Sequence, residues 1–215
     1  MTRAILLTRP NFDLITNYLF YWSIFVIREA NKKGFKVLDL QGNKANKQTF
    51  TSYIKKHEPL LVFFNGHGND NAIAGHDNEI LVEVNKNEQL LVEKIVYARS
   101  CNAVSKLGPA CIKKSTLAFI GYKKKYALGY TPSQISDPLK DKVAGLFLEP
   151  SNLIPISLLK GNTAGYSYKK SQEAMWRNFM FMLSTKAFPN QKDAAPYLWA
   201  NRKYQTILGN PETHM

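Results

Sequence analysis

A histidine and a cysteine each follow a short apolar run of the sequence. His67 follows the run Leu60–Phe64 within the motif Asn-Gly-His-Gly, and Cys101 follows the run Ile95–Ala98 within the motif Arg-Ser-Cys. A cysteine acts as a nucleophile when a base or proton shuttle stands beside it, and an imidazole titrates near neutral pH. These residue types therefore indicate acyl-transfer chemistry at a thiol.

Each part of such a site has a candidate in the sequence. Cys101 is the candidate nucleophile, and a helix beginning at this point would lower the pKa of its thiol. His67 would protonate the leaving amine. Gly68 allows a close approach of the backbone, so we expect its N–H and that of Cys101 to form an oxyanion hole. The alternative is structural: Cys101 would be a small buried residue and His67 the cap of a turn.

The remaining histidines and the second cysteine are weaker candidates. His76 lies in a polar insert, His57 in an amphipathic helix and His214 in the last segment, and Cys111 falls inside a helical stretch. Two cysteines are too few for a disulfide framework and lack the second pair of a zinc site. We therefore expect no metal, no cofactor and a reducing compartment.

Two buried strands are expected to position His67 and Cys101. Both apolar runs are rich in β-branched and aromatic residues, which is typical of a parallel sheet buried on both faces. Residues just past the carboxyl ends of such strands line the ligand crevice, so both side chains should face one crevice. The alternation of strands and helices before them predicts right-handed crossovers. We expect further strands at Ala4–Thr8, Phe35–Leu40 and Leu117–Tyr122, and helices at Leu14–Lys33, Lys47–Lys56 and Asn87–Lys94.

The rest of the chain is less regular. The insert Asn69–Asn85 contains two apolar segments and predicts a β-hairpin on the rim of the crevice. A helical stretch with a break at Gly108-Pro109 follows Cys101, and Lys123–Asp137 predicts an exposed loop. Helices are expected at Pro138–Leu148, Asn152–Leu159 and Ala164–Thr185, and Phe188–His214 is less periodic.

Length and composition suit one domain. The 215 residues are 45% hydrophobic, and we expect a single domain over 1–215 with a core at about 1–122 and a helical and loop completion at about 123–215. The longest apolar runs fall short of the roughly 18–20 residues of a membrane span, and no signal peptide is recognised, so we expect a cytoplasmic protein without a membrane partner.

The net charge of +13, from 29 Lys and Arg against 16 Asp and Glu, could serve a nucleic-acid or acidic-protein partner. The lysines are mostly spread in pairs, which is typical of a solvated surface. Nucleic acid is therefore the weaker expectation, which the charge alone does not exclude.

The motifs resemble the caspase-like (clan CD) superfamily of cysteine peptidases. The likeness covers Ala4–Tyr122 and comprises Asn-Gly-His-Gly after one strand, Ser-Cys after the next, and a strand ending Phe-Ile-Gly-Tyr. It is closest to the gingipain-like and CHAT (caspase-HetF-associated with TPRs) branches. It implies a three-layer αβα sandwich with a mostly parallel sheet, and a dyad of His67 and Cys101 that needs no acidic orienter. The Gln-Ala-Cys-Arg-Gly pentapeptide of caspases is absent, since Asn102-Ala103 follows Cys101.

Arg99 is the candidate substrate-binding residue. Side chains two apart on a strand share a face, so Arg99 should lie on the same side as Cys101. In many caspase-like peptidases this position helps to shape the pocket for the residue before the scissile bond. A guanidinium pairs with carboxylates, which favours substrates with Asp or Glu. The alternative is that Arg99 pairs with an internal acid.

These features predict a cysteine endopeptidase acting on protein or peptide substrates, with a regulated role in signalling or defence and a regulatory protein partner. The alternative is a catalytically silent caspase-fold module that binds a protein or nucleic acid through its basic surface. A nucleotide-binding domain is disfavoured, because Arg9-Pro10-Asn11 stands where a glycine-rich phosphate loop would follow the first strand.

Overall fold

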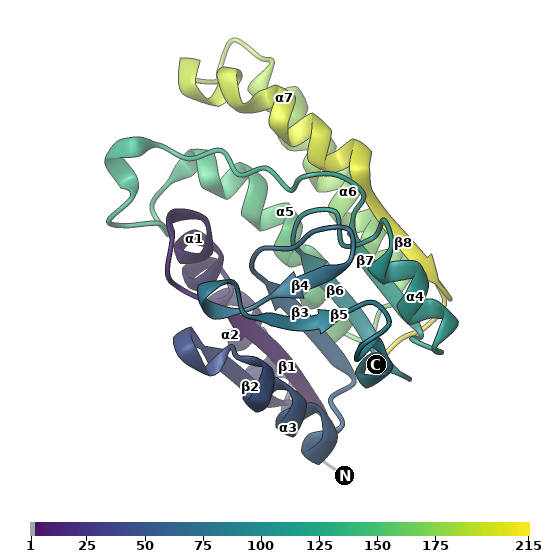
Figure 1. Ribbon diagram of the computed structural model, residues 1–215. Helices are drawn as coiled ribbons and strands as arrows, with labels where there is room; N and C mark the ends of the chain where they lie inside the picture. Colours follow the sequence, from purple (N-terminus) through teal and green to yellow (C-terminus); the bar gives the residue numbers. More distant parts are fainter. Residues whose placement is uncertain (1–2) are drawn as a thin grey trace.

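A six-stranded sheet forms the centre of the computed structural model, which describes residues 3–215 (Figure 1). Its strand order is β2-β1-β3-β6-β7-β8, and all neighbours are parallel except β7 and β8. The strands are β1 (Ala4–Arg9), β2 (Lys36–Gln41), β3 (Leu61–Asn65), β6 (Ile95–Arg99), β7 (Ala118–Tyr122) and β8 (Gln205–Gly209).

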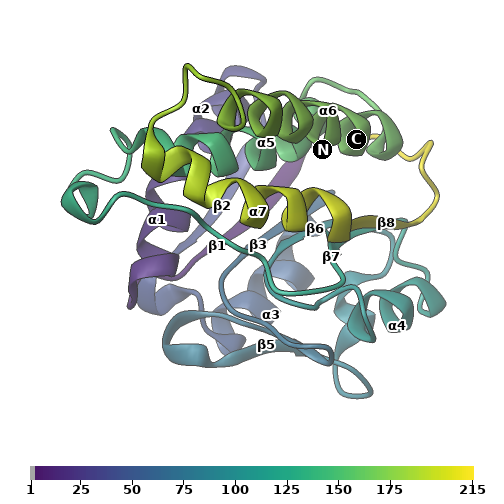
Figure 2. The same cartoon turned by 90° about the horizontal axis from the view of Figure 1, so that it is seen from above.

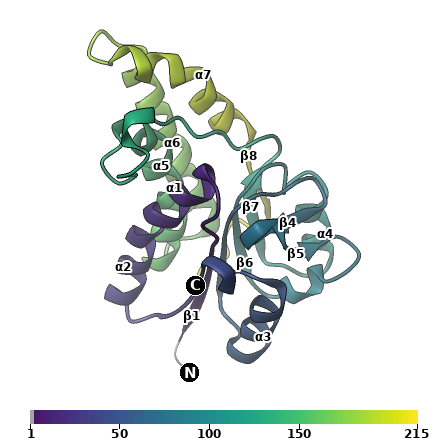
Figure 3. The ribbon, with the colours of Figure 1, turned by 60° about the vertical axis from the view of Figure 1, so that its left-hand side comes forward.

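Helices cover both faces of this sheet (Figures 2 and 3). One side carries α1 (Leu14–Trp22), α2 (Ile24–Lys32), α5 (Lys142–Leu159), α6 (Ala164–Met182) and α7 (Pro189–Tyr204). The other side carries α3 (Lys47–His57), α4 (Leu107–Lys113) and the hairpin of β4 (Ala72–Ala74) and β5 (Ile80–Glu83). Short 3₁₀ turns are η1 (Gly42–Lys44), η2 (His76–Asn78), η3 (Glu88–Leu91) and η4 (Pro132–Gln134). The predicted three-layer α/β architecture with a mostly parallel sheet is confirmed.

The central strands are apolar along their whole length because both faces of the sheet are covered. In β3, Leu61 and Phe63 pack in the cluster that includes residues of α2 and α5, whereas Val62 and Phe64 pack in the cluster that includes residues of α3 and α4. Strand β6 alternates in the same way. This double burial explains why the two runs show no alternation of polar and apolar residues.

The helix expected over Leu14–Lys33 is interrupted at Ser23. The carbonyl of Trp22 accepts a hydrogen bond from Asn152 Nδ2 at 2.8 Å, so a side chain of α5 supplies its partner. The Ser23 hydroxyl bonds to the carbonyl four residues earlier and accepts from Arg99 Nη2 at 3.1 Å. These long-range side-chain bonds lie at the junction, and the single-helix prediction is wrong.

Two further helix predictions needed correction. The segments expected at 138–148 and 152–159 form one helix, α5, which contains two prolines. Pro150 has no N–H for the carbonyl of Leu146, and Asn178 Nδ2 of α6 donates to that carbonyl at 2.8 Å. Gly108-Pro109 is no break, because α4 begins at Leu107 and a proline fits the first turn of a helix.

The last third of the chain completes the sheet. Strand β8 pairs antiparallel with β7 from Gln205 opposite Tyr122 to Gly209 opposite Ala118. Neither β8 nor α7 was predicted, because β8 is only partly buried and lacks the continuous apolar run of the central strands, and α7 has weak periodicity. The hairpin expected in the insert is confirmed as β4 and β5.

No helix within residues 3–215 combines the length and apolar character that a membrane crossing requires.

Replacing Phe64 by alanine should lower the free energy of unfolding by about 3–5 kcal/mol, because its fully buried ring packs 5.4 Å from that of Phe50 and a cavity would remain. Urea unfolding followed by circular dichroism measures this loss. Leu183→Ala is the control: its side chain is 58% exposed and the expected change is within about 0.5 kcal/mol. Equal losses in both variants would contradict this description of the core.

Candidate active site

The turn that carries His67 leaves the carboxyl end of β3 through a glycine. Gly66 has a φ of +145°, and a Cβ added there would lie 2.7 Å from the carbonyl oxygen of Ala74 in the hairpin. Only glycine fits this position without displacing the hairpin. The carbonyl of His67 accepts from the N–H of Ala74 at 2.9 Å, so the hairpin also holds the turn.

The turn that carries Cys101 packs directly against the His67 turn. A Cβ added to Gly68 would lie 3.1 Å from the Cys101 carbonyl oxygen and 3.1 Å from Ser100 Cβ. Asn102 has a φ of +58°, and its Nδ2 donates to Asp70 Oδ1 at 2.8 Å. The structure therefore brings the segments of His67, Gly68 and Cys101 together at the carboxyl edge of β3 and β6.

The Cys101 thiol is not at a helix N-terminus. Helix α4 begins six residues later, so the expected lowering of the thiol pKa by a helix is wrong. Burial raises the pKa of Cys101, and the Tyr126 carbonyl and the charge of Lys125 offset this only in part. The thiol donates to the Tyr126 carbonyl with an Sγ···O distance of 3.9 Å. It is therefore a protonated thiol at neutral pH.

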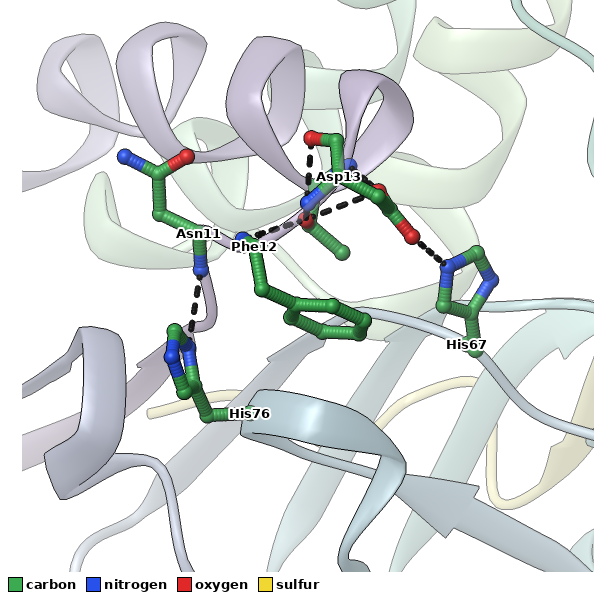
Figure 4. Close-up of polar contacts among 6 residues, drawn as sticks. Asn11, Phe12, Asp13, His67 and His76 are labelled. Atoms are coloured by element: carbon green, nitrogen blue, oxygen red, sulfur yellow. Dashed lines mark hydrogen bonds and ion pairs between the residues drawn. The ribbon is translucent and has the colours of Figure 1, made fainter.

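Asp13 belongs to the candidate site although the sequence pattern did not predict it. It is the N-cap of α1, where its Oδ1 accepts from the N–H and hydroxyl of Thr16 at 2.8 Å each. Its other oxygen, Oδ2, lies 2.5 Å from His67 Nε2 (Figure 4). Burial alone would raise the pKa of Asp13, but the hydrogen bonds from Thr16 and His67 outweigh it and hold this pKa below its ordinary value.

The Asp13 contact defines which nitrogen of His67 is free. With Nε2 bonded to the carboxylate, Nδ1 is the nitrogen left to exchange a proton with another group. The spacing Asp-x-x-Thr before an apolar run signals a helix cap in the sequence. Nothing local signals that the second carboxylate oxygen reaches a histidine 54 positions away.

The two backbone N–H groups expected to stabilise an oxyanion are both available. Within residues 3–215, neither Gly68 nor Cys101 donates its N–H to another protein group. Free donors at such a position can stabilise a developing negative charge.

Arg99 does not reach the crevice. Its side chain is fully buried and bonds to Asn65 Oδ1 at 2.9 and 2.5 Å, to Asn152 Oδ1 at 3.0 Å and to Ser23 Oγ at 3.1 Å. Its guanidinium also lies 5.0 Å from the centre of the Phe63 ring. Neither the expected substrate contact nor the alternative pairing with an internal acid describes this environment, since these partners are all neutral.

The other candidate residues lie apart from this site, with one exception. Cys111 is buried, and burial raises its pKa to about 12. His57 bonds to Lys36 on the protein surface, and His214 is exposed. His76 is the exception, because it lies close to the segment that carries Asp13 (Figure 4). No group of three or more His, Cys, Asp or Glu side chains in the described part of the chain could hold a metal ion.

Two solved structures of a cysteine proteinase have a similar fold. The Arg-specific cysteine proteinase gingipain R (RgpB) superposes with a TM-score of 0.65 at 10% identity, covering 99% of this chain and 47% of that chain. The complex of Porphyromonas gingivalis RgpB pro- and mature domains gives a TM-score of 0.60 at 10% identity, covering 98% and 47%. This chain thus spans about half the length of both structures.

The comparison defines the fold as caspase-like, as predicted. It shows the fold alone, and membership of the caspase-like superfamily and of its CHAT branch stays a prediction. No protein-family model and no curated protein matches the sequence.

Replacing Arg99 by methionine should lower the free energy of unfolding by about 3 kcal/mol, because it leaves the buried acceptors on Asn65, Asn152 and Ser23 without their donor. Urea unfolding measures the change. The matched control is Arg28→Met, at an exposed position of α2, with an expected change within about 0.5 kcal/mol. An Arg99→Met protein as stable as the wild type would show that Arg99 does not hold these elements together.

Proposed function

We propose that this protein is a cysteine endopeptidase of the CHAT and gingipain-like type, with Cys101 as nucleophile and His67 as its base and acid. The observation that carries the proposal is the contact between the Cys101 turn and the His67 turn, with the His67 imidazole bonded to a carboxylate. The cysteine proteinase fold supports it. Asp13 makes the site a triad rather than the expected dyad.

In this mechanism the Cys101 thiol passes its proton to His67 Nδ1 while Sγ attacks the scissile carbonyl carbon. The carbonyl π electrons move to oxygen, and the N–H groups of Gly68 and Cys101 stabilise the oxyanion. Collapse of the intermediate breaks the C–N bond, and the imidazolium gives its proton to the leaving nitrogen. Water then attacks the thioester, with His67 as base, and releases the acid and the thiol.

The resting thiol is turned toward Tyr126. Because burial keeps its pKa high, Cys101 becomes reactive when it leaves the Tyr126 carbonyl and meets His67. A substrate that occupies the crevice would favour this rotation. The proposed enzyme is therefore slow toward small alkylating agents and faster toward peptide reagents that fill the site.

The cleft next to the Cys101 turn carries two lysines and one aspartate, Asp193, among mostly apolar and aromatic side chains. A cavity of about 950 Å³ lies between the 124–130 segment and α7, and Asn102, Lys124, Lys125 and Tyr126 contribute to its lining. The amide of Asn201 in α7 pairs with both backbone groups of Ala127, at 2.8 and 2.7 Å, and so fixes this wall. Gingipain R is described as Arg-specific. For this chain we propose a preference for acidic substrates that depends on Lys125 rather than on Arg99.

The expected biology follows from the proposed activity. The substrates are proteins or peptides in the cytoplasm, the role is in signalling or defence, and a regulatory protein partner controls access to the site. Nucleic acid is retained only as the weaker partner for the net charge of +13.

Intact-mass analysis after exposure to peptidyl acyloxymethyl ketones with terminal Asp, Lys or Arg tests the proposal. We expect one adduct, fastest with the Asp reagent, that is absent in Cys101→Ala and slowed at least about 100-fold in His67→Ala. Cys111→Ala is the control, and it should react like the wild type because the Cys111 thiol is buried. A folded wild type that forms no adduct with any reagent would favour the catalytically silent binding module instead.

Asp13→Asn should slow this labelling by about 10- to 100-fold, because a neutral amide no longer stabilises the imidazolium. Asparagine is an equally good N-cap, so α1 should persist.

The contribution of Asp13 to stability is complete above the ordinary carboxyl pKa of 3.8 and is lost as the pH falls through its lowered pKa. Acid unfolding of Asp13→Asn should therefore depend less steeply on pH below about 4 than that of the wild type.

A further inference from the structure

A second histidine holds the segment that delivers Asp13. The segment Pro10–Asp13 joins β1 to α1 in only four residues, and the η2 turn of the hairpin lies against it (Figure 4). The backbone N–H of Asn11 donates to His76 Nδ1 at 3.3 Å. His76 therefore accepts a hydrogen bond from the segment two residues before the carboxylate that contacts His67.

The ring of Phe12 lies between the two imidazoles. Its centre is 5.9 Å from that of His67 and 5.3 Å from that of His76, with interplanar angles of 69° and 74°. Both are edge-to-face arrangements, which aromatic rings favour. The N–H of Phe12 also donates to Thr16 Oγ1 at 3.1 Å, and this hydroxyl donates to Asp13 Oδ1. A movement of Phe12 would therefore change its ring contact with His67 and, through Thr16, the hydrogen bond to Asp13.

The backbone around His76 is tied to the segment that precedes α3. Its backbone N–H donates to the Ala45 carbonyl at 2.8 Å, and a Cβ added to the preceding Gly75 would lie only 1.9 Å from the same oxygen. The Glu79 carboxylate accepts from the N–H of Lys47 at 3.0 Å, which ties the hairpin to the start of α3. The backbone that carries His76 is therefore held against the neighbouring segments, next to Asn11.

We propose that His76 is a positioning residue: by accepting a hydrogen bond from the N–H of Asn11 it holds Asp13 against His67. The position of Asp13 relative to His67 does not depend on what the protein does. The expected effect on labelling of Cys101 rests on the proposed peptidase function. A movement of the β4–β5 hairpin would then alter the site. If the η2 turn moved away, Asn11 would lose its hydrogen bond to His76, and Asp13 would no longer be held against His67.

The acceptor role requires that His76 Nδ1 carry no proton. The Asp77 carboxylate lies 3.8 Å from His76 Nε2, on the opposite side of the ring, and is compatible with a proton on Nε2. The two contributions of His76 can therefore be separated by substitution. His76→Asn keeps an acceptor near the Nδ1 position and removes the ring, whereas His76→Phe keeps a ring and removes the acceptor.

The first measurement is the tautomer of His67, read from imidazole ¹⁵N shifts of the full chain at neutral pH. Bonding of Nε2 to Asp13 requires the Nε2–H form in neutral His67, and we expect this form in the wild type and in His76→Asn. In His76→Phe and His76→Ala we expect a mixture of tautomers. His57→Ala, remote from the site on α3, is the matched control and should resemble the wild type.

The second measurement is the rate of Cys101 labelling by the peptidyl ketone. We expect His76→Phe and His76→Ala to react about tenfold more slowly, and His76→Asn to stay within about threefold of the wild type. Unchanged His67 tautomers in His76→Phe would overturn the proposal, as would a His76→Asn protein impaired as much as His76→Phe. If His76→Ala does not fold, the comparison of His76→Asn with His76→Phe still tests the proposal.

The two readouts separate the inference from the proposed function. A wild type that forms no adduct but shows a His76-dependent His67 tautomer would retain the positioning role and reject the peptidase. A wild type that forms the adduct but shows no dependence on His76 in either measurement would retain the peptidase and reject the positioning role.

Discussion

The site depends on the hydrogen bonds that the buried guanidinium of Arg99 makes. Burying a charge without a counter-charge is costly, and hydrogen bonds reduce this cost: the guanidinium of Arg99 donates to Asn65, Asn152 and Ser23, and its face lies against Phe63. Those partners belong to β3, to α5 and to the junction of α1 and α2. A single side chain of β6 thereby connects the sheet to three helices.

The position of this connection explains how two separate turns form one site. Asn65 and Arg99 are partners in the register of β3 and β6, and each lies two residues before a candidate catalytic side chain. His67 and Cys101 therefore leave the sheet from a point where the strands cannot slip relative to each other. Gly68 then allows the two turns to pack backbone to backbone.

Local pattern was sufficient for the central strands and for placing His67 and Cys101 at neighbouring strand ends, because buried parallel strands have continuous apolar runs. Long-range contacts account for what was missed. The break at Ser23 lies beside bonds from Asn152 and Arg99, and the role of Asp13 depends on a histidine in another segment. The strand of Arg99 was predicted correctly. Its burial was not, because burial depends on packing against other elements, and residue spacing along one strand does not report that packing. The continuous α5 likewise includes an acceptor satisfied by α6.

The antiparallel pairing of β7 with β8 has a consequence for synthesis on the ribosome. Tyr122 and Gln205 are 83 positions apart, so the outer edge of β7 is complete long before its partner strand emerges. At translation rates of about 5–20 residues per second, that interval lasts roughly 4–17 seconds. An apolar strand with an open edge can pair with a neighbouring chain during this time. Polysome density and chaperone supply, rather than the stability of the finished protein, would then limit its yield in cells.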